Sequence, residues 1–381
     1  MRKLSHWLFA ALILTLTLTV ANVIAQEYTS RRDVFQDEAL RRDFNIQGEY
    51  LATISGINIG LHVIADGGGK FRTVVYVGGL PGDGWRPGGQ QVLGTAQVEG
   101  DTITFNITEI RGGLTEIRTN ETKKGKIIIV VPQRGQDGGQ GGGMGGGQGF
   151  RGVPVKIEVE NPAMTFEKQF RQSPTLNGQP PAGAVVLFDG TNVDKFEPGA
   201  KINEMPQRQG GGQNAGQRPA GAGNTLWAEA VSKPFEGKPY KMHIEFMLSY
   251  MPQARGQARS NSGVYLDERY ECQVLDSFGL DSKNDDCGGF YQVAAPTVNM
   301  CFPPLTWQTY DFDFTPAKYN GDQKTANARV TVKHNGVVIH DNIELPKETP
   351  GRKAEGANPL GVYLQGHGNK VQYRNIWVQY K

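Results

Sequence analysis

The sequence has 381 residues, a formal net charge of +2 and only three cysteines. This length exceeds that of a typical single domain and favours two domains, each long enough to bury a core. The near-neutral balance of 40 basic and 38 acidic residues excludes the strongly basic surface that nucleic-acid binding requires, and it gives no reason to expect binding to anionic lipid.

The first 25 residues are predicted to form a secretory signal peptide. Arg2 and Lys3 precede an apolar run from Trp7 to Val20, and small residues follow up to Ala25, the expected cleavage site. A membrane anchor is the alternative, but the run is shorter than the ~20 residues that a membrane span needs. No second run of this length follows, so we expect a secreted or periplasmic protein that contacts no membrane once the signal peptide is removed.

The next part of the chain is predicted to be a charged segment at 26–47 and a smaller antiparallel β domain at 48–170. Its short runs, such as "INIGLHVIADGGGKFRTVVYVGG" and "DTITFNITEI", are separated by Gly, Asp and Asn. Glycine-rich tracts at 135–149 and 207–223 have few side chains to bury and are interpreted as surface insertions. Residues 171–183, rich in Pro and Gly, are interpreted as an interdomain linker.

Residues 184–381 form the second predicted domain, again dominated by strands. Two hairpins are predicted from turn dipeptides, Asn335-Gly336 in "ARVTVKHNGVVIHDN" and Gly368-Asn369 in "LGVYLQGHGNKVQYRNIWVQY". No long amphipathic helix appears, so the fold class is predicted to be all-β, with a sandwich or jelly roll as the architecture of this half.

The three cysteines are Cys272, Cys287 and Cys301. In an oxidising compartment two of them can pair, and we predict a disulfide between Cys287 and Cys301 across a short loop. Cys272 is then free and buried on a strand. Three free thiols are the alternative, because the sequence alone does not fix the pairing.

Several strands of the second domain have one apolar face and one face of reactive polar residues. In "KMHIEFMLS" the apolar residues alternate with His243 and Glu245, and in "RYECQV" with Arg269, Glu271 and Gln273. Any two-sheet sandwich has a polar outer face, so solvation explains each strand taken alone. These residue types also bind and transform sugars, and together they indicate a saccharide site if the strands adjoin.

The stretches "NSGVYLDERYECQVLDSFG", "NMCFPPLTWQTYDFDF", "ARVTVKHNGVVIHDNIEL" and "PLGVYLQGHGNKVQYRNIWV" together resemble the 3-keto-disaccharide hydrolase domain family, over residues 183–381. The resemblance implies a concanavalin A-like jelly roll of the lectin/glucanase type. It also implies a hydrolase for glycosides whose glucose unit carries a ketone at position 3. Two positions depart from the family pattern: Cys272 stands where Val is usual, and Gly366 replaces the Asp of "QDHG", so His367 lacks an acidic neighbour.

A 3-keto group acidifies the hydrogen on C2, so a base can remove it, the C1 substituent can leave, and water can add back. Such an elimination needs a base near C2, a donor at the ketone oxygen and an acid at the leaving oxygen. We expect Glu271 or His367 to be the base and Arg269 to hold the oxyanion. Glu245 is expected to be the acid or to orient His243.

The expected ligand is a small-molecule carbohydrate, and the sequence pattern is silent on oligomeric state. The substrate-binding set is predicted to be His243, Asn261, Tyr265, Gln273, Asp276 and Gln365. The rival chemistry is a two-carboxylate glycosidase that uses Glu245 and Glu271. No cofactor is predicted, although a divalent metal could bind His243, Glu245 and Glu271 without a metal-spacing motif. The same residues also fit a lectin-like binding module, and the composition fits a structural surface protein with glycine-rich spacers.

Overall fold

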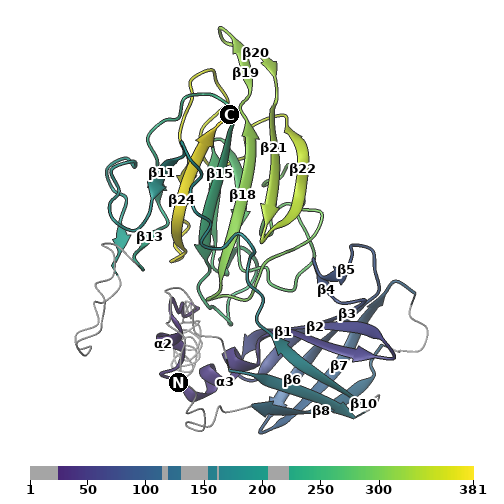
Figure 1. The fold of residues 1–381 in the computed structure, drawn as a ribbon. Coiled ribbons are helices and arrows are strands. Elements are labelled where there is room, and N and C mark those ends of the chain that lie inside the picture. The colour runs from purple at the N-terminus through teal and green to yellow at the C-terminus, as the bar shows by residue number, and fades with distance from the viewer. Residues whose placement is uncertain (1–24, 114–118, 130–152, 161–162, 205–222) are drawn as a thin grey trace, which may run out of the picture.

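The computed structural model describes residues 25–113, 119–129, 153–160, 163–204 and 223–381. The predicted signal peptide lies outside these residues except for Ala25. The glycine-rich tract at 207–223 lies outside them except for Gly223, and the tract at 135–149 lies wholly outside them. Nearly all regular structure in the described chain is β, as predicted (Figure 1). Among the described residues no helix is both long enough and apolar enough to cross a membrane.

The N-terminal half forms a closed antiparallel barrel, with strand order β1-β10-β9-β8-β7-β6-β3-β2. Because β1 pairs with both β10 and β2, the sheet has no open edge. The sequence predicted an antiparallel β domain here but not its closure. The strands are β1 (Gly48–Ile54), β2 (Ile57–Gly67), β3 (Lys70–Val77), β6 (Gln91–Glu99), β7 (Thr102–Arg111), β8 (Thr122–Ile129), β9 (Val155–Glu160) and β10 (Ala163–Gln169).

Two short helices precede the barrel in the charged N-terminal segment, α2 (Arg31–Val34) and α3 (Glu38–Ile46). The Asp37 side chain caps α3 by accepting a hydrogen bond from the Leu40 amide at 2.8 Å. Val34 and Ile46 are buried in the same core as Phe71 of the barrel, so the helices belong to this half of the molecule. A small parallel pair, β4 (Leu80–Pro81) and β5 (Gly84–Trp85), follows β3.

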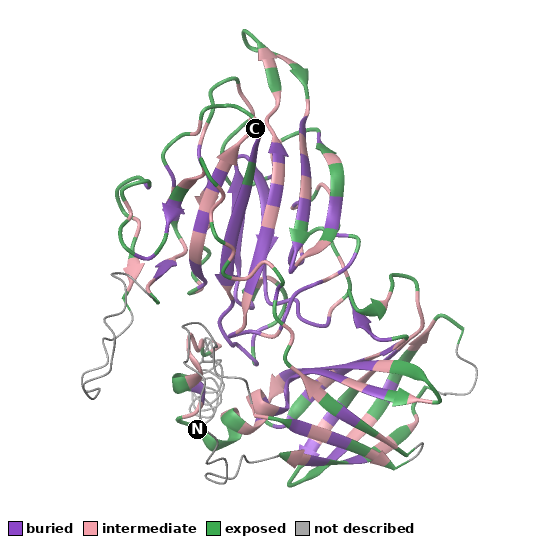
Figure 2. Cartoon of the chain, viewed as in Figure 1, coloured by how far each residue is buried: buried purple, intermediate pink, exposed green. Residues whose placement is uncertain are grey.

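The C-terminal half consists of two antiparallel sheets that share one hydrophobic core. In Figure 2 many residues of the central strands β15 and β18 of the large sheet are buried. The large sheet has the order β12 (Ile202–Asn203), β13 (Thr225–Trp227), β24 (Gln372–Tyr380), β15 (Tyr240–Met247), β18 (Trp307–Thr315), β21 (Ala328–His334), β22 (Val337–Leu345), and β11 (Val185–Phe188) pairs with β24. The small sheet has the order β14 (Ala230–Val231), β23 (Tyr363–Leu364), β16 (Ser262–Leu266), β17 (Tyr270–Val274), and a separate pair is formed by β19 (Lys318–Asn320) and β20 (Gln323–Ala326).

Alternation decides which side chains enter the shared core. Met242, Ile244 and Phe246 of β15 and Cys272 and Val274 of β17 all belong to it. The residues between them on each strand therefore point away from the core, toward the outer face of their own sheet. The outer faces of the large and small sheets lie on opposite sides of this two-sheet domain. The more specific expectation of a concanavalin A-like jelly roll stays a prediction.

Of the two predicted hairpins, one is confirmed and one is wrong. Asn335 and Gly336 join β21 to β22 with φ values of 49° and 81°, the left-handed conformations that this dipeptide favours. Gly368 and Asn369 instead connect β23 of the small sheet to β24 of the large sheet. A local turn signal does not determine which sheet the following strand joins.

Buried groups pack the barrel against the two-sheet domain. Arg259 is 2% exposed, and it donates hydrogen bonds to Asp276 Oδ2 at 2.6 Å and to the Ala65 carbonyl of β2 at 3.3 Å. His62 of β2 lies against the ring of Phe278, with the ring centroids 4.7 Å apart. The two halves are therefore held together by specific contacts and not only by the connecting chain.

Candidate functional site

Glu245 lies on the outer face of the large sheet, beneath the connecting chain predicted as a linker. The Asn177 amide and the Asn375 side chain donate hydrogen bonds to its Oε1, and Arg374 Nε donates to its Oε2 at 2.6 Å. Burial alone would raise the pKa of Glu245, but the hydrogen bond from His243 and the Arg374 charge hold it below its ordinary value. This carboxylate is fully engaged in holding the connecting chain on the sheet.

His243 lies beside Glu245 and is equally enclosed. Its Nδ1 is 2.6 Å from Asp311 Oδ1, and its ring stacks on Trp377 with a centroid distance of 5.3 Å. Burial lowers the pKa of His243, but Asp311 and Glu245 outweigh it and raise the pKa to about 9. The imidazole is therefore a buried cation at neutral pH that pairs with two carboxylates. This cluster stabilises the fold of the large sheet.

Glu271 lies on the outer face of the small sheet, where it is only 3% exposed. It faces Tyr265 across the β16–β17 pair, and Tyr265 Oη donates a hydrogen bond to Glu271 Oε2 at 2.9 Å. Burial raises the pKa of Glu271 to about 7, and the Tyr265 hydrogen bond offsets only part of this effect. Within the described chain no Lys, Arg or His forms an ion pair with Glu271. A buried carboxyl that titrates near neutrality is a candidate general base.

Gly263 of β16 provides the space that the Glu271 side chain occupies. In the ladder Gly263 faces Gln273, two pairs away from the Tyr265–Glu271 pair and therefore on the same face. A Cβ atom on Gly263 would lie 2.3 Å from Glu271 Oε1, much closer than non-bonded atoms approach. The carboxylate thus reaches over β16 because residue 263 has no side chain.

Amide side chains extend from this carboxyl along the same face. Gln365 Nε2 donates to Tyr265 Oη at 3.1 Å, Asn261 Nδ2 donates to Gln257 Oε1 at 2.9 Å, and Gln273 Nε2 donates to the same Gln257 oxygen at 3.3 Å. Gln365 Oε1 and Asn261 Oδ1 are buried and accept no hydrogen bond from another described residue. Unpartnered acceptors beside a neutral amide network suit the hydroxyl donors of a sugar.

Arg269 anchors a strap, residues 346–361, that crosses this face. Its Nε donates to the Ala354 carbonyl at 2.9 Å, its Nη2 to the Asn358 carbonyl at 3.0 Å, and its Nη1 to Asp267 Oδ2 at 2.5 Å. All three guanidinium nitrogens therefore have hydrogen-bond acceptors within the protein, and Arg269 is 4% exposed. Arg269 is therefore occupied as a strap anchor and is not free to hold a substrate oxyanion.

The structure brings together only part of the predicted site. Five of its residues share the outer face of the small sheet: Glu271, Tyr265, Gln273, Asn261 and Gln365. His367 follows on the exposed loop after β23, without a hydrogen bond or ion pair from its side chain to another described residue. Asp276 is bound to Arg259 at the interface with the barrel instead.

The expectation that His243 and Glu245 line one trough with Glu271 is wrong. They lie on opposite outer faces with the shared core between them, because β15 and β17 belong to different sheets. The same separation rules out a glycosidase pair of Glu245 and Glu271, and it breaks up the suggested metal ligands. Within the residues that the structure describes, no group of three or more His, Cys, Asp or Glu is arranged to hold a metal ion.

The predicted disulfide between Cys287 and Cys301 is not formed, and Cys272, Cys287 and Cys301 are all free, buried thiols. Cys287 Sγ is 3.2 Å from Tyr310 Oη, and Cys301 Sγ donates to the Leu275 carbonyl at 3.5 Å. Burial raises the pKa of the Cys272 and Cys301 thiols well above the ordinary value. They are thus protonated core residues and not nucleophiles.

Several residues of this face do not belong to the predicted site. Thr349 of the strap accepts a hydrogen bond from the Glu271 amide at 2.8 Å, and the Arg352 guanidinium lies 4.2 Å from the Tyr363 ring centroid. Tyr363 in turn packs against Tyr265, with ring centroids 5.5 Å apart. Tyr363 alternates with Gln365, so its face was predictable, whereas the strap residues follow no periodic pattern.

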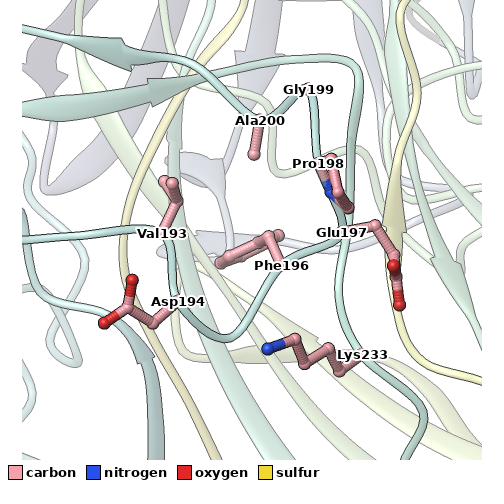
Figure 3. A pocket seen from close by; sticks show the side chains of 8 residues that line it. All are labelled: Val193, Asp194, Phe196, Glu197, Pro198, Gly199, Ala200 and Lys233. Atoms are coloured by element: carbon pink, nitrogen blue, oxygen red, sulfur yellow. The ribbon is translucent and has the colours of Figure 1, made fainter.

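A surface hollow lies elsewhere in the two-sheet domain. It has a volume of about 400 Å³ and is lined by residues from the 193–200 segment and by Lys233 (Figure 3). The charged side chains Asp194, Glu197 and Lys233 surround it, with Phe196 among them. None of the predicted site residues lines this hollow. We therefore place the candidate site by its chemistry, on the outer face of the small sheet.

Comparison with known proteins gives one clear match. The model of the family described as "3-keto-alpha-glucoside-1,2-lyase-like domain" matches residues 183–379. No curated protein matches the sequence.

Solved structures similar to the chain include the following three. Two are candidate glycosyl hydrolases from Parabacteroides distasonis. The match to the first has 26% identity and a TM-score of 0.41, and it covers 52% of this chain and 84% of that chain. The match to the second has 15% identity and a TM-score of 0.28, and it covers 54% of this chain and 92% of that chain. A Trypanosoma rangeli sialidase is 10% identical and covers 87% and 59%, with a TM-score of 0.27.

Proposed function

Because the chain belongs to the 3-keto-alpha-glucoside-1,2-lyase-like family, we propose that it is an exported enzyme that cleaves glycosides of 3-keto-glucose. The proposed reaction is elimination across C1 and C2, followed by addition of water. The observation that supports this best is Glu271, a buried carboxyl with its pKa raised to about 7 and a phenol hydrogen-bonded to it. A base of this strength is matched to the removal of a proton made acidic by a neighbouring ketone.

In the first step Glu271 takes the C2 proton, and the C–H electron pair moves into an enolate that spans C2, C3 and the ketone oxygen. Tyr265 Oη lies 2.9 Å from Glu271 Oε2, so both groups reach the same side of a sugar. Once Glu271 is protonated it no longer needs the Tyr265 hydrogen bond. The phenol can then donate to the enolate oxygen, the role first expected of Arg269.

In the second step the enolate expels the C1 oxygen and a double bond forms between C1 and C2. Water then adds its oxygen to C1, and C2 regains a proton, which gives 3-keto-glucose and the free alcohol. In the chair form of an α-glucoside, the C2 hydrogen and the C1 oxygen are axial on opposite faces of the ring. The leaving oxygen is therefore protonated by a group other than Glu271 and Tyr265.

The test compares a 3-keto-α-glucoside with its unoxidised parent α-glucoside as substrates for the purified protein. We expect alcohol release from the ketone only, because the parent has no acidic C2 hydrogen. Glu271→Gln should lower the rate by about 10²-fold or more. Equal cleavage of both glycosides, or binding of the ketone without turnover, would overturn the proposal and favour an ordinary glycosidase or a lectin.

A further inference from the structure

A second carboxylate lies at the edge of the small sheet opposite β17. Glu229, in the connection between β13 and β14, lies against Gly366: a Cβ atom at position 366 would be 2.8 Å from Glu229 Cβ and 3.2 Å from its Cδ. Residue 366 can pass this side chain because it is glycine. The sequence has no carboxylate at position 366, but the fold places one beside it from position 229.

The backbone at Glu229 is held in an unusual conformation. Its φ is +72°, in the left-handed region that side chains other than Gly, Asn and Asp rarely adopt. The Glu229 amide donates to the Leu364 carbonyl at 2.8 Å, although Ala230 is the residue that faces Leu364 in the ladder. Two residues thus oppose one, as in a β-bulge, a feature that redirects side chains next to active sites.

Hydrogen bonds fasten the chain next to this bulge, at residues 365 and 366, to tyrosines of the face that carries Glu271. The Gly366 amide donates to Tyr363 Oη at 3.3 Å, and Gln365 Nε2 donates to Tyr265 Oη at 3.1 Å. The loop that carries His367 is therefore fastened to the same face as Glu271. Glu229 and His367 flank Gly366, both are exposed, and neither side chain is hydrogen-bonded or ion-paired to another described residue.

On the basis of the proposed function, we propose that His367 protonates the departing C1 oxygen and that Glu229 is the positioning residue that holds its protonated ring. The C1–O bond breaks, its electron pair stays on the oxygen, and the imidazolium N–H proton moves to that oxygen. The enolate pair forms the C1–C2 double bond, and Glu271 releases the proton from C2 to solvent before water adds. Neutral His367 then regains a proton from solvent, so the step is balanced without a further reactant.

The experiment uses two substrates that differ in their need for an acid. Methyl 3-keto-α-glucoside has a poor leaving group, whereas 4-nitrophenyl 3-keto-α-glucoside has a good one. Glu229→Gln and His367→Gln should each lower methanol release by about 10²-fold but leave nitrophenol release nearly unchanged. In D₂O both variants should still exchange the C2 hydrogen of the methyl substrate. Glu229→Asp should recover part of the lost rate, since it keeps the carboxylate.

Glu236→Gln is the matched control, because Glu236 is an exposed carboxylate of the same domain that pairs only with Lys238 among the described residues. It should behave as wild type with both substrates. Equal losses with both substrates, or no loss with either, would overturn the roles of Glu229 and His367 while leaving the proposed function intact. Failure of the wild-type protein to cleave either ketone would instead refute the proposed function itself.

Discussion

Gly263→Ala tests whether the position of the Glu271 carboxylate matters. The φ of Gly263 is not positive, so alanine fits the backbone without strain. Its Cβ would lie 2.3 Å from Glu271 Oε1, whereas ordinary contact begins at 3.4 Å, so the carboxylate must retreat by about 1 Å. A displacement of this size costs on the order of 10²-fold in rate when it moves a catalytic group.

The assay is steady-state cleavage of a 3-keto-α-glucoside by Gly263→Ala, with stability measured by urea unfolding. We expect kcat to fall by about 10²-fold, with a stability cost of roughly 1–3 kcal/mol from overpacking that leaves the protein folded. Gly356→Ala is the control, because its Cβ would meet only Arg269 Nη2 at 3.5 Å, an ordinary contact. A folded Gly263→Ala protein with wild-type kcat would refute the role given to the Glu271 carboxylate.

The remaining predictions concern titration and the strap. With 4-nitrophenyl 3-keto-α-glucoside, whose leaving group needs no acid, the rate should rise with pH through about 7 as Glu271 ionises. Tyr265→Phe should move this rise to higher pH because it removes the hydrogen bond that lowers the pKa of Glu271, and a rise that stays in place in pH–rate profiles would contradict this. Because folding raises the pKa of His243 from 6.5 to about 9, the stability that His243 contributes is complete below pH 6.5 and is lost as pH rises through 9. Urea unfolding from pH 6 to 10 should show this decline, and Asp311→Asn should flatten it. Equal slopes for the wild-type protein and the variant would count against the His243–Asp311 pair. Arg269→Ala should destabilise the protein by roughly 1–3 kcal/mol, because buried acceptors of the strap lose their donor; lost activity at unchanged stability would restore Arg269 as the oxyanion holder.

The alternation of apolar and polar residues predicted which side of a strand carries the reactive side chains. The alternation in "RYECQV" put Cys272 and Val274 in the core and Glu271 and Gln273 opposite, and the structure agrees. It could not show that all five residues of β17 are buried, because the strap that covers the outer face comes from residues 346–361, distant in sequence. The same burial gives Glu271 its raised pKa.

Long-range pairing was beyond the reach of the sequence. Each strand pattern gives two faces but not the sheet that the strand joins, and this is why Glu245 was expected beside Glu271 although the core separates them. Asn335-Gly336 was predictable because a tight turn between two pairing strands is local. The place of Glu229 beside His367 was not predictable, because it depends on a bulge and on Gly366, more than 100 residues away in the sequence.

The most direct test of the central claim is the fate of the C2 hydrogen during cleavage in D₂O. A 3-keto-α-glucoside with protium at C2 is cleaved by the wild-type protein, and the deuterium content at C2 of the released 3-keto-glucose is read by NMR. Enzyme-free samples and Glu271→Gln correct for spontaneous exchange. Elimination and hydration through Glu271 predict deuterium at C2 of the product at first turnover. Cleavage that leaves protium at C2 would contradict the account.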